Sequence, residues 1–551
     1  MTVAVTGPTA PRLVPYGEAA LLVELEDLPA ALRFREAISQ AAHRDGPLVD
    51  AVVGARTVLL VGRDPAAVPL LRDRAAPVLA ALGVEDDDRD AATGEKVEVV
   101  VTYDGDDLEE VARLTGLSTA EVVEAHTGTP WLVGFAGFAP GFAYLVDGDP
   151  RLQVPRRAEP RSRVPAGSVG LAGRFSGIYP QDSPGGWQLL GTTDAVLWDV
   201  DRDPPALLAP GTSVRFVEAG PPSSGPVPAP ASSVPAAERT TAPLDGLDGL
   251  DGGGGGRGLE VLATGPLTLV EDVGRPGLAD VGVGRSGAAD PTAYLLGLRL
   301  VGHLLDPAEL SGPAPASLEV TLGGLSVRAH GDLLVALTGA PCPAHVDGRP
   351  VPHGAPVALA HGRVLTLGTP TAGLRTWVTV RGGIVVAPVL GSRSTDTLAR
   401  IGPPLPTVGD VLPVGVAPAT FPVVEVAPQA AIPGGEVALD LLPGPRADWC
   451  DLTGLADGAW TVSSRSNRVG MRLEGRAIRR RPPYADRELP SEGMVPGAVQ
   501  VPPGGEPVVF LADHPVTGGY PVVAVLTPRA LALAPQLRPG QPVRLKWSRG
   551  R

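Results

Sequence analysis

The chain has 551 residues, 44% of them hydrophobic, and carries a formal net charge of −14 at pH 7. This length predicts several domains, and the hydrophobic content excludes general disorder. The acidic net charge argues against nucleic acid as a partner, and the lack of a long apolar run argues against a membrane span. The two cysteines give no disulfide framework. We therefore expect a cytoplasmic protein.

The first part of the chain predicts a small α+β unit, which we assign to residues 11–95. Strand-like stretches at 12–26 and 49–61 alternate with helix-like stretches at 29–42 and 68–82, where apolar residues recur at helical spacing. This alternation predicts a two-layer packing of helices on a sheet.

After Lys96 the pattern changes to short strands between glycine and proline turns, which is typical of a closed barrel, and we assign residues 96–218 to it. Two short helices are expected near its start, at 108–116 and 118–127. Ser118 and Glu121 can form a capping box on the second helix. Residues 219–258, rich in proline, alanine, serine and glycine, predict a disordered linker.

Two further β units are expected after the linker, at residues 259–424 and 425–548. A helix is predicted over 291–301, because Asp290 suits the N-cap and Pro291 the first helical position. The predicted fold class is therefore mostly β with α+β, in which tandem barrel modules follow a small N-terminal α+β domain.

One sequence pattern occurs twice along the chain. Val-Pro-Ala-Gly-Ser-Val at 164–169 is followed by Pro-Gly-Gly-Trp at 184–187 and by Pro-Gly-Thr-Ser-Val-Arg-Phe at 210–216. Val-Pro-Gly-Ala-Val at 495–499, Thr-Gly-Gly-Tyr at 517–520 and Pro-Gly-Gln-Pro-Val-Arg-Leu at 539–545 repeat it in the same order at similar spacing. The repetition predicts two copies of one β-rich module, one in each half.

The Gly-Gly-aromatic loops and the arginine clusters are the candidate binding features. Glycines let backbone amides approach a ligand, and the aromatic ring offers a flat surface; the alternative is a tight turn packed by its own aromatic.

The guanidinium of an arginine matches a carboxylate with two hydrogen bonds; the alternative is a solvated arginine at a barrel edge. The arginine clusters are Arg156, Arg157, Arg161 and Arg163, and Arg465, Arg468 and Arg472.

Asp290 and Glu492 are the candidate catalytic acids. The alternative for Asp290 is the helix N-cap, and Glu319, a third acid in a strand-like stretch, can pair with an arginine instead. The histidines match no metal signature, so we expect no metal. Of the basic residues only Lys96 and Lys546 are lysines, and neither lies in a phosphate-binding loop or a biotin-attachment context.

Longer motifs in both halves resemble a pair of known families. In the first half, the stretches 138–145, 154–157, 164–169 and 178–187 resemble the allophanate hydrolase subunit 1 family. In the second half, the stretches 272–277, 286–290, 391–395, 464–470 and 517–521 resemble the subunit 2 family. The resemblance covers residues 11–218 and 259–547, so the chain looks like a fusion of two proteins that often occur separately.

This resemblance implies cyclophilin-like barrels and the B and C components of an ATP-dependent 5-oxoprolinase. Such an enzyme opens 5-oxoproline, a small anionic amide, to glutamate together with a separate A component. ATP is then an expected cofactor whose site we do not locate, since there is no Walker A loop, and the chain carries no covalent biotin. We also consider a homo-oligomer possible.

Two other activities are implied as alternatives. Related modules form the carboxyltransferase part of urea amidolyase, where biotin comes from another domain, and a third relative is an inhibitor of a sporulation kinase with its antagonist. In the first half, the resemblance and the clusters select as substrate-binding candidates Phe142, Tyr144, Arg156, Arg161, Ser168, Tyr179, Ser183, Gly185, Gly186 and Trp187. In the second half they select Arg275, Arg393, Arg465, Asn467, Arg468, Arg472, Gln500, Thr517, Gly518, Gly519 and Tyr520.

Overall fold

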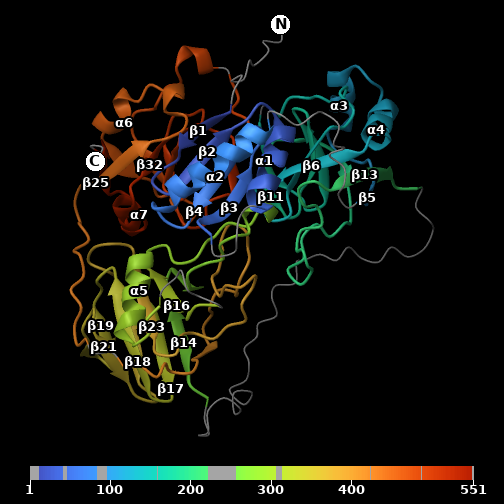
Figure 1. Cartoon of the computed structure of the whole chain (residues 1–551). Coiled ribbons are helices and arrows are strands. Elements are labelled where there is room, and N and C mark those ends of the chain that lie inside the picture. Colours follow the sequence, from blue (N-terminus) through green and yellow to red (C-terminus); the bar gives the residue numbers. More distant parts are fainter. Residues whose placement is uncertain are drawn as a thin grey trace.

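The computed structural model describes residues 11–40, 46–82, 96–157, 159–220, 256–305, 313–421, 424–485 and 487–548. Most of the predicted linker at 219–258 and the end of the predicted unit at 11–95 therefore lie outside the described residues. The chain is built mostly from strands, with a helical layer near its start and β units around it (Figure 1). The predicted fold class, mostly β with a small N-terminal α+β domain, is confirmed.

The N-terminal unit is a four-stranded antiparallel sheet with two helices. Each of the two predicted strands is in fact a pair of strands: the first turns at Gly17, whose φ of 70° suits glycine, and the second turns at residues 54–56. Both helices begin one residue before the predicted start, and α2 ends at the predicted residue; the predicted end of the first helix, at 41–42, lies outside the described residues. The elements are β1 (Arg12–Pro15), β2 (Ala20–Glu24), α1 (Leu28–Gln40), β3 (Leu48–Val53), β4 (Thr57–Gly62) and α2 (Ala67–Leu82), in the sheet order β1-β2-β4-β3.

The next unit is a seven-stranded barrel-like sheet in the order β12-β9-β10-β7-β6-β13-β5. A bridge between Thr102 and Thr192 joins its two edges, and the predicted capping box forms, with Ser118 N–H donating to Glu121 Oε2 at 2.8 Å. The elements are β5 (Lys96–Val101), α3 (Leu108–Thr115), α4 (Thr119–Gly128), β6 (Trp131–Ala136), β7 (Ala143–Val146), β8 (Arg161–Val164), β9 (Ser168–Ala172), β10 (Phe175–Ile178), β11 (Ser183–Gly185), β12 (Gln188–Thr192) and β13 (Ser213–Glu218).

The third unit stacks a six-stranded sheet, β20-β19-β22-β17-β14-β24, on a five-stranded sheet, β15-β16-β23-β18-β21. Helix α5 (Pro291–Leu300) begins as predicted, because Asp290 accepts a hydrogen bond from Ala293 N–H at 3.0 Å, and it packs on β18 and β23. The strands are β14 (Gly258–Thr264), β15 (Leu267–Glu271), β16 (Ser317–Thr321), β17 (Leu325–His330), β18 (Leu333–Gly339), β19 (Ala344–Val346), β20 (Arg349–Pro350), β21 (Pro356–Leu359), β22 (Val364–Leu367), β23 (Arg375–Val380) and β24 (Val411–Pro413), with η2 (Ala279–Val281) preceding α5.

The last unit is a closed barrel, β25-β32-β29-β30-β27-β26-β33. Its elements are β25 (Val437–Pro443), η3 (Ala447–Trp449), α6 (Thr453–Asp457), β26 (Trp460–Val462), β27 (Gly470–Glu474), η4 (Pro482–Tyr484), β28 (Glu492–Gly493), β29 (Ala498–Gln500), β30 (Val508–Phe510), β31 (Thr517–Gly518), β32 (Val522–Leu526), α7 (Pro528–Leu533), η5 (Ala534–Gln536) and β33 (Pro542–Trp547).

The two barrels have the same strand order, which confirms the duplication predicted from the repeated pattern. Taking β5 with β25, β6 with β26 and so on to β13 with β33, each neighbour in one barrel has its counterpart in the other, including the parallel closing pair. Trp131 and Trp460 start equivalent strands, and each indole N–H donates to the carbonyl five residues earlier. The Gly-Gly-aromatic turn begins at the last residue of β11 in one barrel and at the last residue of β31 in the other.

The N-terminal sheet holds the two barrels together. On one side, Phe34 of α1 and Val23 of β2 share a core with Phe142 and Trp187 of the first barrel. On the other side, Leu22 and Leu59 share a core with apolar residues of the last barrel, among them Met494, Val495, Phe510 and Val525. A sheet that buries both faces in this way cannot be separated from either barrel without exposing apolar surface to water.

Candidate functional site

A cavity of about 650 Å³ lies where the first barrel, the third unit and the last barrel meet. The first barrel contributes Phe138, from the loop between β6 and β7, and Ser183 of β11. The last barrel contributes the loop between β26 and β27, including Asn467 and Arg468. The volume falls within the range of small-molecule sites, and a position between domains is where such sites commonly occur.

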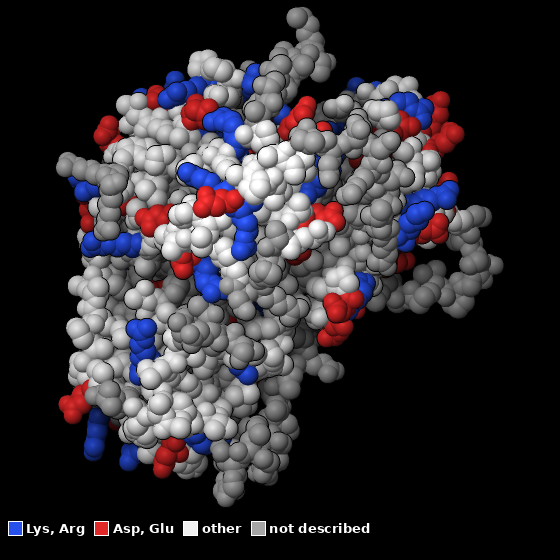
Figure 2. Space-filling view, viewed as in Figure 1, with Lys and Arg blue, Asp and Glu red and all other residues white. Residues whose placement is uncertain are grey.

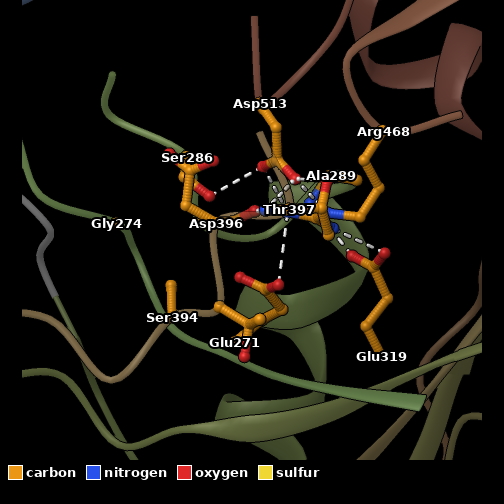
Figure 3. Close-up of polar contacts among 12 residues, drawn as sticks. Glu271, Gly274, Ser286, Ala289, Glu319, Ser394, Asp396, Thr397, Arg468 and Asp513 are labelled. Carbon is orange, nitrogen blue, oxygen red and sulfur yellow. Dashed lines mark hydrogen bonds and ion pairs between the residues drawn. The ribbon is translucent and has the colours of Figure 1, made fainter. Parts of the chain in front are cut away.

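Arg468 forms the buried wall of this cavity and is the centre of an ionic cluster (Figure 3). Its Nε and Nη2 donate to the two oxygens of Asp513 at 2.9 and 3.0 Å, and Nη1 donates to Glu319 Oε1 at 2.6 Å. Nη2 also donates to the carbonyl of Gly287 at 2.7 Å. The guanidinium is thus largely occupied by internal partners, so an anionic ligand would have to compete with them.

The cluster is close to charge balance. Arg375 Nε donates to Glu319 Oε1 at 3.0 Å, so two guanidiniums face Glu319 and Asp513. Burial raises the pKa of Glu271 well above its usual range, despite Arg468 Nη2 at 3.3 Å, and favours the neutral acid there. Although burial opposes it, the pKa of Asp513 is lowered, mainly by the charge and hydrogen bonds of Arg468.

Two sequence motifs are explained by the contacts that support this cluster. Asp272, which is fully buried, accepts hydrogen bonds from the hydroxyls of Ser392 and Ser394, both at 2.6 Å, and from the backbone N–H of Arg393 at 2.7 Å. The Gly-Ser-Arg-Ser-Thr stretch at 391–395 therefore wraps around the carboxylate that begins the 272–277 motif. This fixes the loop that continues to Thr397, whose hydroxyl donates to Asp513 Oδ2 at 2.6 Å.

Backbone strain gathers at the cavity. Among the residues that the structure describes, seven non-glycine residues have positive φ, and three of them line the cavity: Phe138 at 68°, Leu322 at 59° and Arg400 at 57°. A fourth, Ser286 at 51°, donates to Asp513 Oδ1 at 2.7 Å. Residues held in sparsely populated conformations tend to cluster at functional sites, so the strain supports a functional role for this cavity.

Few of the candidates chosen from the first half reach the cavity. Ser183 lines it, whereas Phe142, Tyr144, Tyr179 and Trp187 pack on one another, with the rings of Phe142 and Trp187 5.4 Å apart. The remaining first-half candidates have other surroundings: Arg161 pairs with Asp107 at 2.8 Å, Arg156 is exposed, Ser168 is buried in β9, Gly185 ends β11, and Gly186 follows it.

In the second half, Asn467 and Arg468 line the cavity. The turn residue Tyr520 is 41% exposed and accepts, through its carbonyl, a hydrogen bond from Gln500. The other candidates lie elsewhere: Arg275 is buried and donates to the carbonyl of Ser394, Arg393 donates to the carbonyls of Val386 and Ala314, Arg465 pairs with Glu506, Arg472 is exposed, and Thr517, Gly518 and Gly519 lie at or after β31.

Neither candidate catalytic acid is among the residues that line the cavity. Asp290 caps α5 and accepts a hydrogen bond from Gln536 Nε2 at 2.7 Å, and burial raises its pKa. Glu492 is buried between the N-terminal unit and the last barrel, where it pairs with Arg446, and burial raises its pKa as well. Their catalytic role stays a prediction, and the contacts observed for both are structural.

Sequence reasoning did not select Phe138, Thr397 or Arg400 for the site. Phe138 begins the 138–145 motif and Thr397 lies two residues after the 391–395 motif, so these motifs could have pointed to both residues. Arg400 belongs to no motif and gives no sequence signal of its own, because its importance depends on the loop that brings it to the cavity.

Cofactor chemistry has little support from the described residues. No group of three or more His, Cys, Asp and Glu that could hold a metal ion occurs among the residues the structure describes. Both lysines lie exposed in strands, and among the described residues the cavity lining contains neither a lysine nor a phosphate-type loop. In the face shown in Figure 2, acidic and basic side chains are interspersed. No described helix is long and apolar enough to cross a membrane.

Comparisons with known proteins agree with this division into halves. Residues 11–208 match the family described as carboxyltransferase domain, subdomain C and D, and residues 281–547 match carboxyltransferase domain, subdomain A and B. The solved protein TTHA0988 superposes with a TM-score of 0.80 at 34% identity, covering 96% of this chain and 99% of that one. The fold and these matches define the class: a protein that carries all four subdomains of a carboxyltransferase domain.

Two curated relatives narrow the class to a family. The C component of 5-oxoprolinase from Escherichia coli K12 is 37% identical over 291 residues, which cover 52% of this chain and 89% of the relative. The B component of 5-oxoprolinase from Escherichia coli O157:H7 is 42% identical over 209 residues, which cover 36% of this chain and 93% of the relative. The chain belongs to the family of the B and C components of 5-oxoprolinase, with the B-like half preceding the C-like half.

Proposed function

We propose that the chain is the fused B and C component of an ATP-dependent 5-oxoprolinase, which hydrolyses the lactam of 5-oxoproline to glutamate together with a separate A component. The observation that carries the proposal is that one chain contains relatives of both the B and the C component, each matched over about nine-tenths of its length. In the overall reaction water adds across the lactam C–N bond and ATP is hydrolysed. We assign ATP no site on this chain and derive no step through it.

The cavity between the halves is the expected substrate site of this enzyme. It is enclosed by elements of both the B-like and the C-like half, and a fusion keeps these halves together. The buried Arg468 cluster gives it a rigid polar wall, and the strained loops carrying Phe138 and Arg400 complete it. A preorganised wall of fixed charges costs little reorganisation when a polar substrate binds or reacts.

Reconstitution tests the proposal. The purified chain is mixed with the A component from the same source, 5-oxoproline and ATP, and glutamate is measured by mass spectrometry. We expect glutamate only when all four are present, with the chain alone, the A component alone and a mixture lacking ATP as controls. A complete mixture that makes no glutamate would refute the proposal.

The second candidate is a carboxyltransferase that accepts a carboxyl group from biotin on a partner protein. The description of the matched family favours it. The discriminating experiment supplies a biotin carrier loaded with labelled carboxybiotin and urea as acceptor. Label transferred to urea by the chain, without glutamate formation in the reconstitution, would support this second activity.

A further inference from the structure

We propose that Arg400 binds the carboxylate of the substrate in the cavity between the two halves, an inference that rests on the proposed function because 5-oxoproline supplies that carboxylate. Among the described residues, three arginines line the cavity, Arg375, Arg400 and Arg468. The proposal depends on which of them has a guanidinium free to accept a ligand.

Arg375 and Arg468 are committed to internal partners. Arg375 donates to Glu319 and to the carbonyl of Pro535, and its side chain is 4% exposed. Arg468 uses its fork for Asp513. The guanidinium of Arg400, in contrast, makes no hydrogen bond or ion pair with any residue that the structure describes, and Arg400 is exposed. It is the one arginine of the described lining whose donors are available.

The charges at this side of the cavity favour an anion. Asp182, which also lines the cavity, is held by Arg163 Nε and Nη2 at 2.8 and 2.6 Å and by the backbone N–H of Ala166 at 3.0 Å. The pKa of Asp182 is lowered first by Ala166 N–H, then by Arg163, and to a smaller extent by the charge of Arg400. Arg163 already neutralises Asp182, so the charge of Arg400 remains uncompensated and attracts an anionic ligand.

The backbone holds Arg400 at this position despite a cost. Asp396 and Ile401 pair across a tight turn, and Arg400 occupies it with a φ of 57°, where glycine is the usual residue. An L-residue in this conformation costs roughly 1–2 kcal/mol relative to an unstrained one. A strained arginine with a free guanidinium on a cavity wall is what a ligand-recognition residue requires.

Two variants and a neutral ligand test the assignment. Arg400→Gln removes the charge, and Arg400→Gly removes the side chain at a φ that glycine accepts without strain, so this variant keeps the turn. Arg349→Gln, at an exposed arginine of β20 outside the cavity lining, is the matched control. Dissociation constants are measured by calorimetry for 5-oxoproline and for its carboxamide, 5-oxoprolinamide.

Losing the charge-assisted contact should weaken 5-oxoproline binding about tenfold to hundredfold in both Arg400 variants. The carboxamide should bind wild type and variants alike, and Arg349→Gln should bind both ligands as wild type does. Unchanged binding of 5-oxoproline in the variants, equal losses for the carboxamide, or no binding of 5-oxoproline to wild type would overturn the assignment. If 5-oxoproline binding depends on Arg400 but the reconstituted mixture forms no glutamate, the oxoprolinase proposal alone is refuted. If the mixture forms glutamate and Arg400→Gln leaves the KM for 5-oxoproline unchanged, the Arg400 assignment alone is refuted.

Discussion

Arg468 and Asp513 form a bidentate ion pair, with Nε to Oδ2 at 2.9 Å and Nη2 to Oδ1 at 3.0 Å, and both side chains are almost completely buried. The pair joins the loop before β27 to the segment after β30, and both carry the cavity wall. The same carboxylate accepts hydrogen bonds from Ser286 and Thr397 of the third unit. The ion pair lies within the last barrel, and the hydrogen bonds that its carboxylate accepts link that barrel to the third unit.

The first prediction concerns this pair. Arg468→Met should leave Asp513 buried without its cation and Glu319 with Arg375 alone, and should cost about 3–5 kcal/mol, as is usual when one member of a buried pair is removed. Arg468→Lys should cost less but still destabilise, because an ammonium cannot reproduce the fork. The midpoints of urea unfolding measure both. Arg465→Met, which breaks an exposed pair with Glu506, is the control and should cost less than about 1 kcal/mol. Equal midpoints for Arg468→Met and Arg465→Met would contradict the prediction.

The second prediction concerns Arg446, which joins the N-terminal unit to the last barrel. Its guanidinium contacts Glu24 at the end of β2 and Glu492 of β28, and all three side chains are largely buried. Arg446→Met should leave two buried carboxylates facing each other and loosen the N-terminal sheet, so that amides of β1–β4 exchange hydrogen faster by at least about tenfold. Arg544→Met, which removes an exposed pair with Glu436, should leave this exchange unchanged. If the amides of β1–β4 exchange hydrogen in Arg446→Met at the wild-type rate, apolar packing alone holds the interface between the N-terminal unit and the last barrel.

The third prediction concerns the contact between the loop after β6 and the last barrel. A Cβ on Gly137 would overlap the hydroxyl oxygen of Thr517. Gly137→Ala should therefore destabilise the chain by about 1–3 kcal/mol, as overpacking usually does. Thr517→Ala in the same chain removes the overlapping atoms and should recover part of the loss, which a double-mutant cycle measures. Gly434→Ala, with open space around it, is the control. If Thr517→Ala does not reduce the loss of stability caused by Gly137→Ala, the overlap with Thr517 is not the cause of that loss.

The sequence predicted the fold better than the site, and particular residues show why. The repeated Val-Pro, Gly-Gly and Pro-Gly landmarks mark turns of the barrel, and local turn chemistry is visible in sequence. The capping box at Ser118 and the N-cap at Asp290 are local in the same way. The stretches 12–26 and 49–61 each predict a single strand, because apolar residues lie on both sides of short hairpin turns that only Gly17 and Gly54 mark.

The site depends on contacts between distant segments, which no local pattern records. Arg468 was selected as a free fork for a substrate carboxylate, yet its carboxylate partner is internal, because Asp513 and Glu319 come from the last barrel and the third unit. Trp187 and Tyr520 occupy equivalent turns, but the first is buried in an aromatic group and the second is exposed. Duplication thus predicts where a turn lies and leaves open whether it binds anything.

The last prediction concerns the pH dependence of stability and His126. The imidazole is fully buried, lies 2.7 Å from Tyr103 Oη and 2.8 Å from Ser176 Oγ, and stacks on Phe216, and burial lowers its pKa to about 3. The unfolded chain protonates this histidine below about pH 6.5, whereas the folded chain stays neutral until about pH 3. Protonation therefore favours unfolding, and this residue should remove up to about 1.4 kcal/mol of stability for each pH unit below 6.5.

Urea unfolding of wild type and His126→Gln at a series of pH values tests this. The free energy of unfolding of His126→Gln should fall less steeply than that of wild type between about pH 6.5 and 4.5, and the two pH profiles should run parallel above about pH 7.5. Parallel profiles over the whole range would mean that folding does not lower the pKa of His126.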